Sequence, residues 1–303
     1  MDNKNENIFL NIIEEYQRIS FTGGQFSKAC TILKSIFKDE PDTSIFLSLS
    51  GALVPAGLRK SIVDLLNTGK ISGIITTGAM LTHDYIEELG FKHSPIHGHI
   101  NDKALREQGI NRILDVGASN DAFEAMEIDL HEWLEKKYSS NKAETNISTP
   151  EFLKDLGEKF SDQSIIGICY EKEIPIYCPA ITDSMLGVHC MTFAEYSKFK
   201  LDPILELKQF ISQCFDSKKT SAIVLGGGVP KNFLFQGMLV SGKELSYAIQ
   251  VTMDRPEHGG LSGATLEEAI SWGKIEFSAK TVTVIADITL VLPLFVNYIK
   301  SLN

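Results

Sequence analysis

The chain has 303 residues, of which 43% are hydrophobic and 22% are charged, so it can bury one large core or two ordinary ones. Its formal net charge of −10 argues against non-specific nucleic-acid binding, because that function leaves a basic footprint. The five cysteines are odd in number and none has CxxC spacing. Neither a disulfide scaffold nor a structural zinc site is therefore expected.

The N-terminal sequence MDNKNENIFL is polar and acidic, whereas a secretory signal would be basic and then apolar. No apolar run approaches the roughly 20 residues that cross a bilayer. The longest run, around Ile288–Val296, is interrupted by Pro293. We therefore expect a cytoplasmic protein with no membrane partner and no nucleic-acid partner.

Short apolar, β-branched runs alternate along the chain with longer amphipathic stretches. The short runs predict strands over Ser44–Leu49, Ile71–Thr76, Ser164–Tyr170, Ile174–Cys178, Ser221–Leu225, Ser246–Val251 and Thr281–Ala286. The longer stretches predict helices over Gln25–Phe37, Val54–Asn67, Asp121–Tyr138, Pro150–Phe160, Pro203–Phe215, Lys231–Val240 and Thr265–Lys274, with a closing helix over Leu290–Leu302. Nearly continuous hydrophobic strands that alternate with helices are typical of a parallel sheet covered on both faces. The predicted fold is α/β, with a mostly parallel sheet flanked by helices.

The polar stretch Ser139–Thr149 is the one linker-like segment in the sequence. Strand–helix alternation continues on both sides of it, so we interpret it as a surface loop inside one fold. No internal repeat is visible. The sequence therefore predicts a single domain that spans residues 1–303.

A glycine cluster follows the predicted strand Ser221–Leu225. It consists of Gly226, Gly227 and Gly228, with Pro230 in the first turn of the next predicted helix. Glycines at such a point let backbone N–H groups approach an anion at a helix N-terminus, as in dinucleotide sites. The spacing is not GxGxxG, so a tight turn without a ligand stays open as the alternative.

Other turns rich in small residues also lie near the carboxyl ends of predicted strands. They are Ser48-Leu-Ser50-Gly51-Ala52, Thr76-Thr77-Gly78-Ala79 and Gly259-Gly260-Leu261-Ser262-Gly263-Ala264. In an open α/β sheet these ends meet at one crevice. Together the turns favour a ligand the size of a nucleotide, although each alone is weak.

The segment Thr265-Leu-Glu267-Glu268-Ala-Ile-Ser-Trp272-Gly273-Lys274 has two interpretations. Thr265 and Glu268 match a capping box, and Lys274 suits the last turn of a helix, where a cation is favoured. Alternatively, a lysine beside the aromatic wall of Trp272 could be desolvated enough to lose its proton and attack an imine. The pattern alone leaves both open.

The sequence GATLEEAISWGKI resembles the active-site segment of deoxyhypusine synthases. Further matches to that family follow in order over nearly the whole chain. They are Gly57-Leu58-Arg59, Thr76-Thr77-Gly78, Asn111-Arg112-Ile113, Pro179-Ala180-Ile181-Thr182-Asp183-Ser184, Leu225-Gly226-Gly227-Gly228-Val229 and Val284-Ile285-Ala286-Asp287. The resemblance implies a Rossmann-like NAD-binding fold with Lys274 as a covalent nucleophile.

The resemblance also implies site residues and partners. Lys274 would carry the aminobutyl group of the polyamine spermidine as an imine, with Glu268, Trp272 and Asn232 in contact with the substrate. NAD would be bound by Ser50, Thr76, Thr77, Gly78, Asp183, Gly226, Gly227, Gly228, Ser262 and Asp287. The implied acceptor is a lysine of the hypusine-bearing translation factor, and the implied assembly is a homotetramer with active sites between paired subunits.

Several positions depart from the eukaryotic-type pattern. Val188 and Leu261 stand where that pattern has acidic residues, Asn232 where it has histidine, Gly51-Ala52 where it has Ser-Asn and Thr82-His83 where it has Glu-Glu. A cation buried without a counter-charge costs several kcal/mol, so we infer that the amine, its register or the acceptor has changed. These departures resemble the prokaryotic deoxyhypusine-synthase-like branch of the family, some members of which transfer the aminobutyl group to putrescine and make homospermidine. Three alternatives therefore stay open: aminobutyl transfer to putrescine or another free amine, a non-catalytic relative that binds a nucleotide or polyamine, and a simple dehydrogenase, which the lysine makes less economical.

No metal site is predicted. His97-Gly98-His99 has no obvious third ligand and is interpreted as a pair of surface or loop histidines. Glu124, Glu127 and Asp129 form an acidic helix face that we interpret as solvated, and His189 has no assigned role. Cys178 and Cys190 are expected to be buried thiols.

Overall fold

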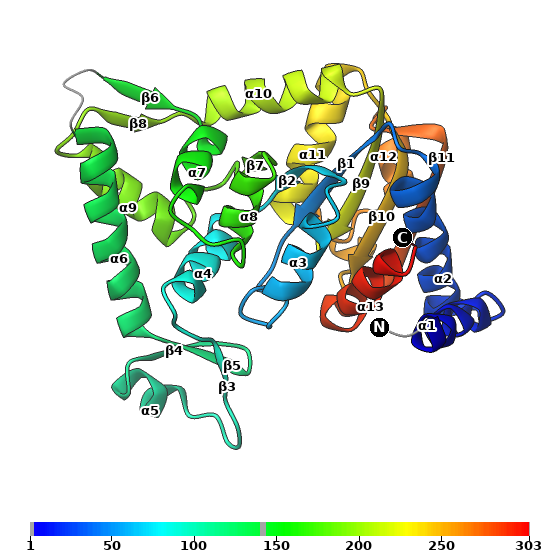
Figure 1. The fold of residues 1–303 in the computed structure, drawn as a ribbon, viewed down its shortest axis with the longest axis horizontal. Helices are drawn as coiled ribbons and strands as arrows, with labels where there is room; N and C mark the ends of the chain where they lie inside the picture. The colour runs from blue at the N-terminus through cyan, green and yellow to red at the C-terminus, as the bar shows by residue number, and fades with distance from the viewer. Residues whose placement is uncertain (1–2, 140–143, 303) are drawn as a thin grey trace. The chain divides into compact units, whose positions relative to one another are not determined.

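The computed structural model describes residues 3–139 and 144–302 (Figure 1). The chain divides into two compact units, which are described separately below. The first unit contains Met1–Ser50, Asp64–Ile75 and Leu207–Asn303, and the second contains Gly51–Val63 and Thr76–Glu206. That the whole chain forms a single domain stays a prediction.

The first unit is built on a parallel sheet. Five of the six strands of the main sheet belong to it, in the order β11-β10-β9-β1-β2, and all four pairings between these neighbours are parallel. The strands are β1 (Thr43–Leu49), β2 (Ile71–Ile75), β9 (Lys219–Leu225), β10 (Leu245–Thr252) and β11 (Ile275–Ile285). The predicted α/β fold with a mostly parallel sheet is confirmed.

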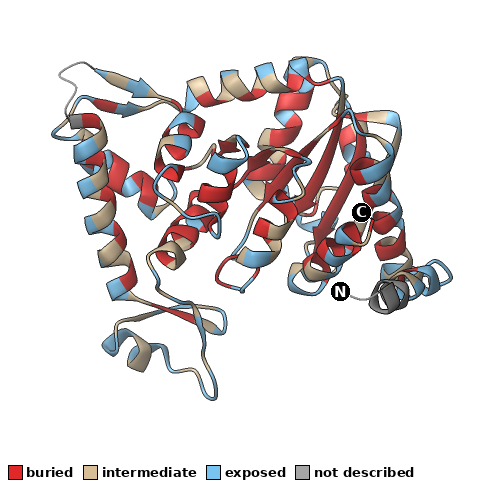
Figure 2. Ribbon diagram, in the orientation of Figure 1, coloured by how far each residue is buried: buried red, intermediate tan, exposed pale blue. Residues whose placement is uncertain are grey.

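Helices cover this sheet. The helices of this unit are α1 (Asn3–Tyr16, which packs on α2), α2 (Phe21–Lys34), α10 (Pro203–Asp216, which begins in the second unit), α11 (Gly228–Ser241), α12 (Leu266–Ile270) and α13 (Ile288–Lys300), with a π-helical turn at Ser35–Asp39 and a 3-10 turn at Pro256–His258. Helix α11 packs against β1 and β2, whereas α2 and α13 pack against β10. All eight residues of β10 are buried, as Figure 2 shows by colour. Burying a side chain such as Ile249 stabilises the fold by about 1.5–3 kcal/mol.

The second unit is mainly helical. Its helices are α3 (Arg59–Leu66, which ends in the first unit), α4 (Gly78–Glu88), α5 (Asp102–Glu107), α6 (Asn120–Leu134), α7 (Thr149–Gly157), α8 (Ile165–Glu171) and α9 (Met185–Ala194), with a π-helical turn at Glu135–Ser139. Strands β3 (Ser94–Pro95), β4 (Ile110–Ile113) and β5 (Val116–Ser119) form an antiparallel sheet. Strands β6 (Thr145–Ile147) and β8 (Phe199–Leu201) pair in parallel, and β7 (Ile176–Tyr177) is a short strand.

The predicted strand Ser164–Tyr170 is wrong, because this apolar run forms helix α8. Ser164 is its N-cap and accepts a hydrogen bond from the Gly167 N–H at 2.7 Å. The buried carboxylate of Asp84 accepts two more from the N–H groups of Ile165 and Ile166, both at 3.0 Å. Three donors of the helix start are thus satisfied, and two of them depend on a side chain more than eighty positions away.

The predicted surface loop Ser139–Thr149 is wrong in part. Residues 140–143 lie outside the described part of the chain, but Thr145–Ile147 form β6 and Ser148 caps α7 in a complete capping box with Glu151. The predicted helix Val54–Asn67 begins only at Arg59, and the predicted strand Ile174–Cys178 shortens to β7. Among the described residues, no helix is both long and apolar enough to span a membrane.

Candidate active site

A pocket in the first unit is lined by residues from α11, from the loop before α12, from α12 and from the turn between α12 and β11. Its walls include Lys231, Asn232, Leu261, Glu268, Trp272 and Lys274. All four residues predicted to carry or contact the substrate, Lys274, Glu268, Trp272 and Asn232, line this one pocket. The structure therefore brings together side chains that lie up to 42 positions apart in the sequence.

The position of Lys274 follows from a sharp turn between α12 and β11. Gly273 has a φ of 65°, a left-handed conformation that glycine adopts without steric penalty. The Lys274 N–H donates to the Ala269 carbonyl at 3.1 Å and closes this turn. The Lys274 ammonium then lies 5.1 Å from the centroid of the Trp272 ring, which is within the range of a cation–π interaction.

Glu268 is an exposed residue that lines the pocket. Thr265 caps α12 by accepting a hydrogen bond from the Glu268 backbone N–H at 3.2 Å. Only this half of the predicted capping box is recorded among the described residues, in contrast to the complete box of α7. The Glu268 carboxylate is therefore available to a cation in the pocket.

Lys231 is the buried cation of this pocket, with only 3% of its surface exposed. Its ammonium donates to Gln250 Oε1 at 3.0 Å, to the Leu261 carbonyl at 3.2 Å and to the Ala264 carbonyl. Burial lowers the pKa of Lys231 from 10.5 to about 8, opposed by the nearby carboxylate of Glu268. All three recorded acceptors are neutral, so the charge is stabilised by dipoles at short range.

Gln250 connects the lysine to the predicted cofactor turns. Its amide donates to the Gly226 carbonyl at 3.0 Å and to the Ser262 carbonyl at 2.8 Å, while its oxygen accepts from Lys231. Neither Lys231 nor Gln250 was predicted from the sequence to have a role in the site. The available signal was a glutamine inside the apolar strand run Ser246–Val251, since a polar residue in a doubly covered strand requires buried partners.

Two of the three glycines of the predicted cofactor turn are required by packing. Gly226 has a φ of 88°, and a Cβ at this position would overlap Ser50 Oγ; a Cβ at Gly227 would overlap the backbone of Ser262. Ser50 Oγ accepts the Gly227 N–H at 2.7 Å. Ser50, Gly226, Gly227 and Ser262 therefore lie together as predicted, and their close contact explains the first two glycines without a ligand.

Gly228 is different, because it faces open space. Its φ is 59°, and the nearest atom to an added Cβ would be Ser262 Oγ at 4.0 Å. Helix α11 begins here with Gly227 as N-cap and no side-chain cap. Backbone N–H groups at such a helix start can bind an anion. Asp287, by contrast, already caps α13, since its Oδ1 accepts from the Thr289 N–H at 2.8 Å.

The remaining predicted cofactor residues lie in the second unit. Thr76 is buried, and Thr77 caps α4 by accepting the Met80 N–H at 3.4 Å. A Cβ at Gly78 would overlap the Ser184 side chain, so α4 approaches the segment that carries Asp183. Asp183 itself is exposed. Thr77, Gly78 and Asp183 thus belong to adjoining segments of this unit, and their role in cofactor binding stays a prediction.

Comparison with known proteins decides the family. A family model for deoxyhypusine synthase matches residues 11–299. The chain belongs to the deoxyhypusine synthase family. It is 40% identical over 291 residues to "Probable deoxyhypusine synthase 1" of Methanosarcina acetivorans, covering 96% of this chain and 90% of that protein. It is 38% identical over 289 residues to "Probable deoxyhypusine synthase 1" of Archaeoglobus fulgidus, covering 95% and 92%.

The fold agrees with this assignment. A crystal structure of a deoxyhypusine synthase candidate from Entamoeba histolytica superposes with a TM-score of 0.67, covering 94% of this chain and 91% of that chain at 19% identity. This likeness shows the fold alone. The resemblance of the GATLEEAISWGKI segment is therefore confirmed at the level of the family, and the chain is a transferase of the deoxyhypusine synthase type.

The positions that depart from the eukaryotic-type deoxyhypusine synthase pattern have structural consequences in this chain. Leu261 is 46% exposed at the rim of the Lys274 pocket, and Glu268 is the one carboxylate among the described residues that line this pocket. In the second unit, His83 Nδ1 lies 2.9 Å from His93 Nε2, and His93 Nδ1 lies 2.8 Å from Glu87. Burial lowers the pKa of His83 to about 4, so this position is neutral rather than acidic.

Proposed function

We propose that this chain transfers the 4-aminobutyl group of spermidine through an imine on Lys274, and that the acceptor is a lysine of the hypusine-bearing translation factor. The observation that supports the proposal is the convergence of Lys274, Trp272, Glu268 and Asn232 on one pocket. A lysine beside an aromatic ring and a carboxylate suits attack on an imine of a cationic substrate.

NAD is the cofactor we propose, because the residues present fit its charged groups. The start of α11 lacks a side-chain cap, and Gly228 leaves open space beside it, which suits a phosphate. When bound, NAD supplies the oxidation of a spermidine C–N carbon and the later reduction of the product imine, so it ends the cycle unchanged. Ser50 and Ser262 border the same turn.

The chain's own residues carry the transfer. The Lys274 amine adds to the imine carbon of oxidised spermidine, and a proton passes from the lysine nitrogen to the leaving nitrogen. The C–N bond to that nitrogen then breaks and 1,3-diaminopropane departs. The aminobutyl group is then an imine of Lys274. The acceptor amine adds to the same carbon and releases Lys274 as a free amine. The Glu268 carboxylate balances the distal ammonium of the aminobutyl chain, and the Trp272 ring shields the imine from water.

A second copy of the chain completes the site in this proposal. The pocket in one chain has a volume of about 60 Å³ and is open to solvent, so one chain does not close over a substrate. Trp272 in the pocket wall is 60% exposed, and Phe277 on β11, three residues after Lys274, is 95% exposed. Large exposed apolar groups mark interaction surfaces, which supports the expected homotetramer with active sites between paired subunits.

Borohydride trapping tests the transfer directly. The purified chain is incubated with NAD and spermidine, reduced, digested and examined by mass spectrometry. We expect an aminobutyl adduct on the peptide that contains Lys274 and no adduct in Lys274→Ala or Lys274→Arg. Lys280→Ala is the matched control, because Lys280 is an exposed lysine of β11, the strand that follows Lys274, and it should keep the adduct.

Each outcome assigns the reaction. When the acceptor is added before borohydride, transfer of the aminobutyl group to the acceptor protein supports the hypusine pathway, whereas transfer only to putrescine supports homospermidine formation. The second outcome is motivated by Leu261 and Asn232, which stand where the eukaryotic-type pattern has an acidic residue and a histidine. No adduct with any polyamine, in a chain that still binds NAD, would mean a non-catalytic relative.

A further inference from the structure

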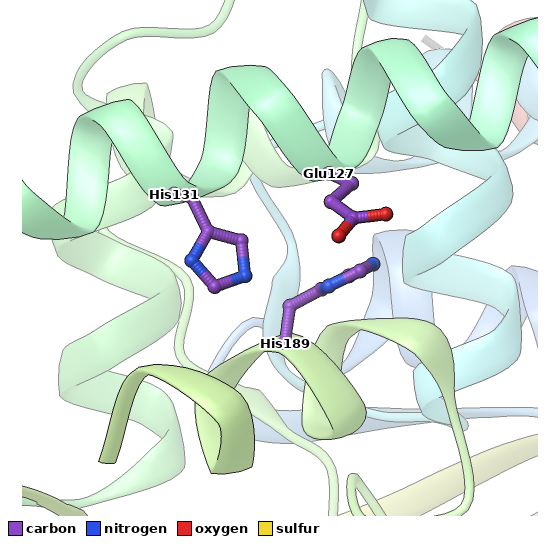
Figure 3. A group of neighbouring side chains, drawn as sticks. All are labelled: Glu127, His131 and His189. Atoms are coloured by element: carbon purple, nitrogen blue, oxygen red, sulfur yellow. The ribbon is translucent and has the colours of Figure 1, made fainter. Parts of the chain in front are cut away.

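Three side chains of the second unit converge between two helices. Glu127 and His131 lie four positions apart on α6 and therefore share one helical face. His189 projects toward them from α9 (Figure 3). One potential ligand atom from each of the three residues lies within 4.8 Å of the others. The arrangement unites two imidazoles and a carboxylate, and none of the three residues belongs to the candidate active site.

Both imidazoles present an unpaired nitrogen to this space. His189 is buried, with 4% of its surface exposed. Within residues 3–139 and 144–302, Nε2 of His189 and Nε2 of His131 are buried atoms without a hydrogen-bond partner. Buried polar atoms are almost always paired, and an unpaired one needs an explanation such as an ion. The rings of His131 and His189 are adjacent, with centroids 5.4 Å apart and planes at 83°, so the two unpaired nitrogens belong to one cluster and indicate a shared ligand.

A neighbouring tyrosine sets the orientation of His131. Its Nδ1 lies 3.1 Å from the Tyr196 hydroxyl. With the proton on Nδ1, that nitrogen donates to the hydroxyl oxygen and leaves the Nε2 lone pair directed at Glu127 and His189. Metal-binding histidines almost always have their second ring nitrogen held in this way. The Tyr196 contact thus supplies the outer support that a metal-bound histidine requires.

We propose that Glu127, His131 and His189 bind a divalent transition-metal ion of the zinc type, which links α6 to α9. Two imidazoles and one carboxylate form a donor set used for zinc and iron(II), whereas calcium and magnesium prefer oxygen ligands alone. Three protein ligands leave a fourth position for water, and the exposure of Glu127 provides access to it. Although the sequence predicted no metal, the fold brings the third ligand to the first two.

To bind a metal ion, the three potential ligand atoms need to move only slightly closer together. Bonds of about 2.1 Å in a tetrahedral shell place neighbouring ligand atoms about 3.4 Å apart, compared with the present limit of 4.8 Å. Glu127 is exposed and has freely rotating side-chain torsions, so its carboxylate can move toward the imidazoles.

Metal content measures the proposal. The full chain is stripped with a chelator, equilibrated with zinc chloride by dialysis and analysed by mass spectrometry of the metal. We expect one zinc per chain, and visible d–d bands without thiolate charge transfer when cobalt(II) replaces zinc. His131→Ala and His189→Ala should abolish stoichiometric binding. Tyr196→Phe should weaken it about tenfold, because outer-shell partners contribute this much.

Two variants keep the test independent of folding. Glu127→Gln changes an exposed side chain, so it preserves the fold and should still weaken zinc binding at least about tenfold. The double variant His97→Ala/His99→Ala also removes two imidazoles of the second unit, both exposed, and should bind zinc like the wild type. The proposal is overturned if the wild type takes up no stoichiometric zinc, if Glu127→Gln and His189→Ala bind it unchanged, if the His97/His99 variant loses it, or if cobalt reports thiolate ligands.

Discussion

Replacing Lys231 by methionine tests whether the pocket holds a buried charge. The pKa of Lys231 falls from 10.5 to about 8 because the side chain is buried. Below about pH 8 the lysine is charged in both folded and unfolded chains, and the folded state bears the full burial penalty. Between about pH 8 and 10.5 the folded chain releases the proton first. The unfolded chain then binds more protons, so stability rises with pH.

The structure gives the size of this effect. The difference between 10.5 and 8 is 2.5, and each pKa unit corresponds to about 1.36 kcal/mol, so the full gain is about 3 kcal/mol. Most of it, about 2 kcal/mol, falls between pH 7.5 and pH 10. Lys231→Met lacks the group and should lack this gain. At every pH it also leaves the Gln250 oxygen and the Leu261 and Ala264 carbonyls without their donor, a constant loss.

Urea unfolding followed by circular dichroism at a series of pH values measures the difference. The free energy of unfolding of the wild type minus that of Lys231→Met should increase by about 2 kcal/mol from pH 7.5 to pH 10, since other titrations cancel in the difference. Lys218→Met is the control, because the Lys218 side chain is 80% exposed, and its difference from the wild type should stay flat. Parallel pH profiles for the wild type and Lys231→Met would refute the idea of a buried charge.

Two further predictions follow from packing and burial. Gly227→Ala would force a Cβ into the Ser262 backbone and should lower the free energy of unfolding by about 1–3 kcal/mol. Gly260→Ala meets nothing within 4 Å and should lie near the wild type in thermal unfolding; equal losses in both variants would contradict the packing argument. Burial raises the pKa of Glu206 from 4.5 to about 7, so the wild type loses stability as pH rises through this interval. Glu206→Gln should be about 1–2 kcal/mol more stable than the wild type at pH 8 and nearly equal at pH 5, and a less stable variant at pH 8 would disprove the penalty.

The strands were predictable wherever both faces of a strand are buried. Ser44–Leu49, Ser221–Leu225 and Ser246–Val251 correspond to β1, β9 and β10, because a doubly covered strand has an almost continuous apolar sequence. Strand β11 begins six residues before the predicted Thr281. Its first half contains Glu276, Ser278 and the exposed Phe277, and a strand at the edge of the sheet need not be apolar throughout.

Elements held by distant side chains were not predictable from local pattern. The apolar sequence of α8 is typical of a strand, but in the structure Asp84 accepts two hydrogen bonds from the N–H groups at its start and it forms a helix. The same reason hides Lys231, whose three acceptors lie 19, 30 and 33 positions away. The neighbouring sequence does not indicate whether a lysine in a helix is buried or exposed. Lys274 was identified by the resemblance of its segment, and not by any property that distinguishes it from a solvated lysine.

The residues of the predicted cofactor turn do lie together, but the prediction that a ligand requires their glycines was incomplete. A nucleotide was invoked because a turn without a ligand could carry larger side chains. Gly226 and Gly227, however, admit no Cβ because of Ser50 and Ser262, so packing alone requires them. Gly228 is the position at which open space and an uncapped helix start coincide. The case for a cofactor phosphate in this unit therefore depends on Gly228 and the start of α11 more than on the number of glycines.

The acidic face of α6 in the second unit also could not be interpreted correctly from local sequence alone. Glu124, Glu127 and Asp129 were interpreted as solvated, but Asp129 accepts a hydrogen bond from Tyr85 at 2.7 Å, and Glu127 faces two imidazoles. The four-residue spacing of Glu127 and His131 was visible in the sequence. His189 lies 58 positions beyond His131, on a helix that was not predicted. Because a ligand set becomes recognisable only when its last member is placed, a helix face cannot be called solvated until the element that covers it is known.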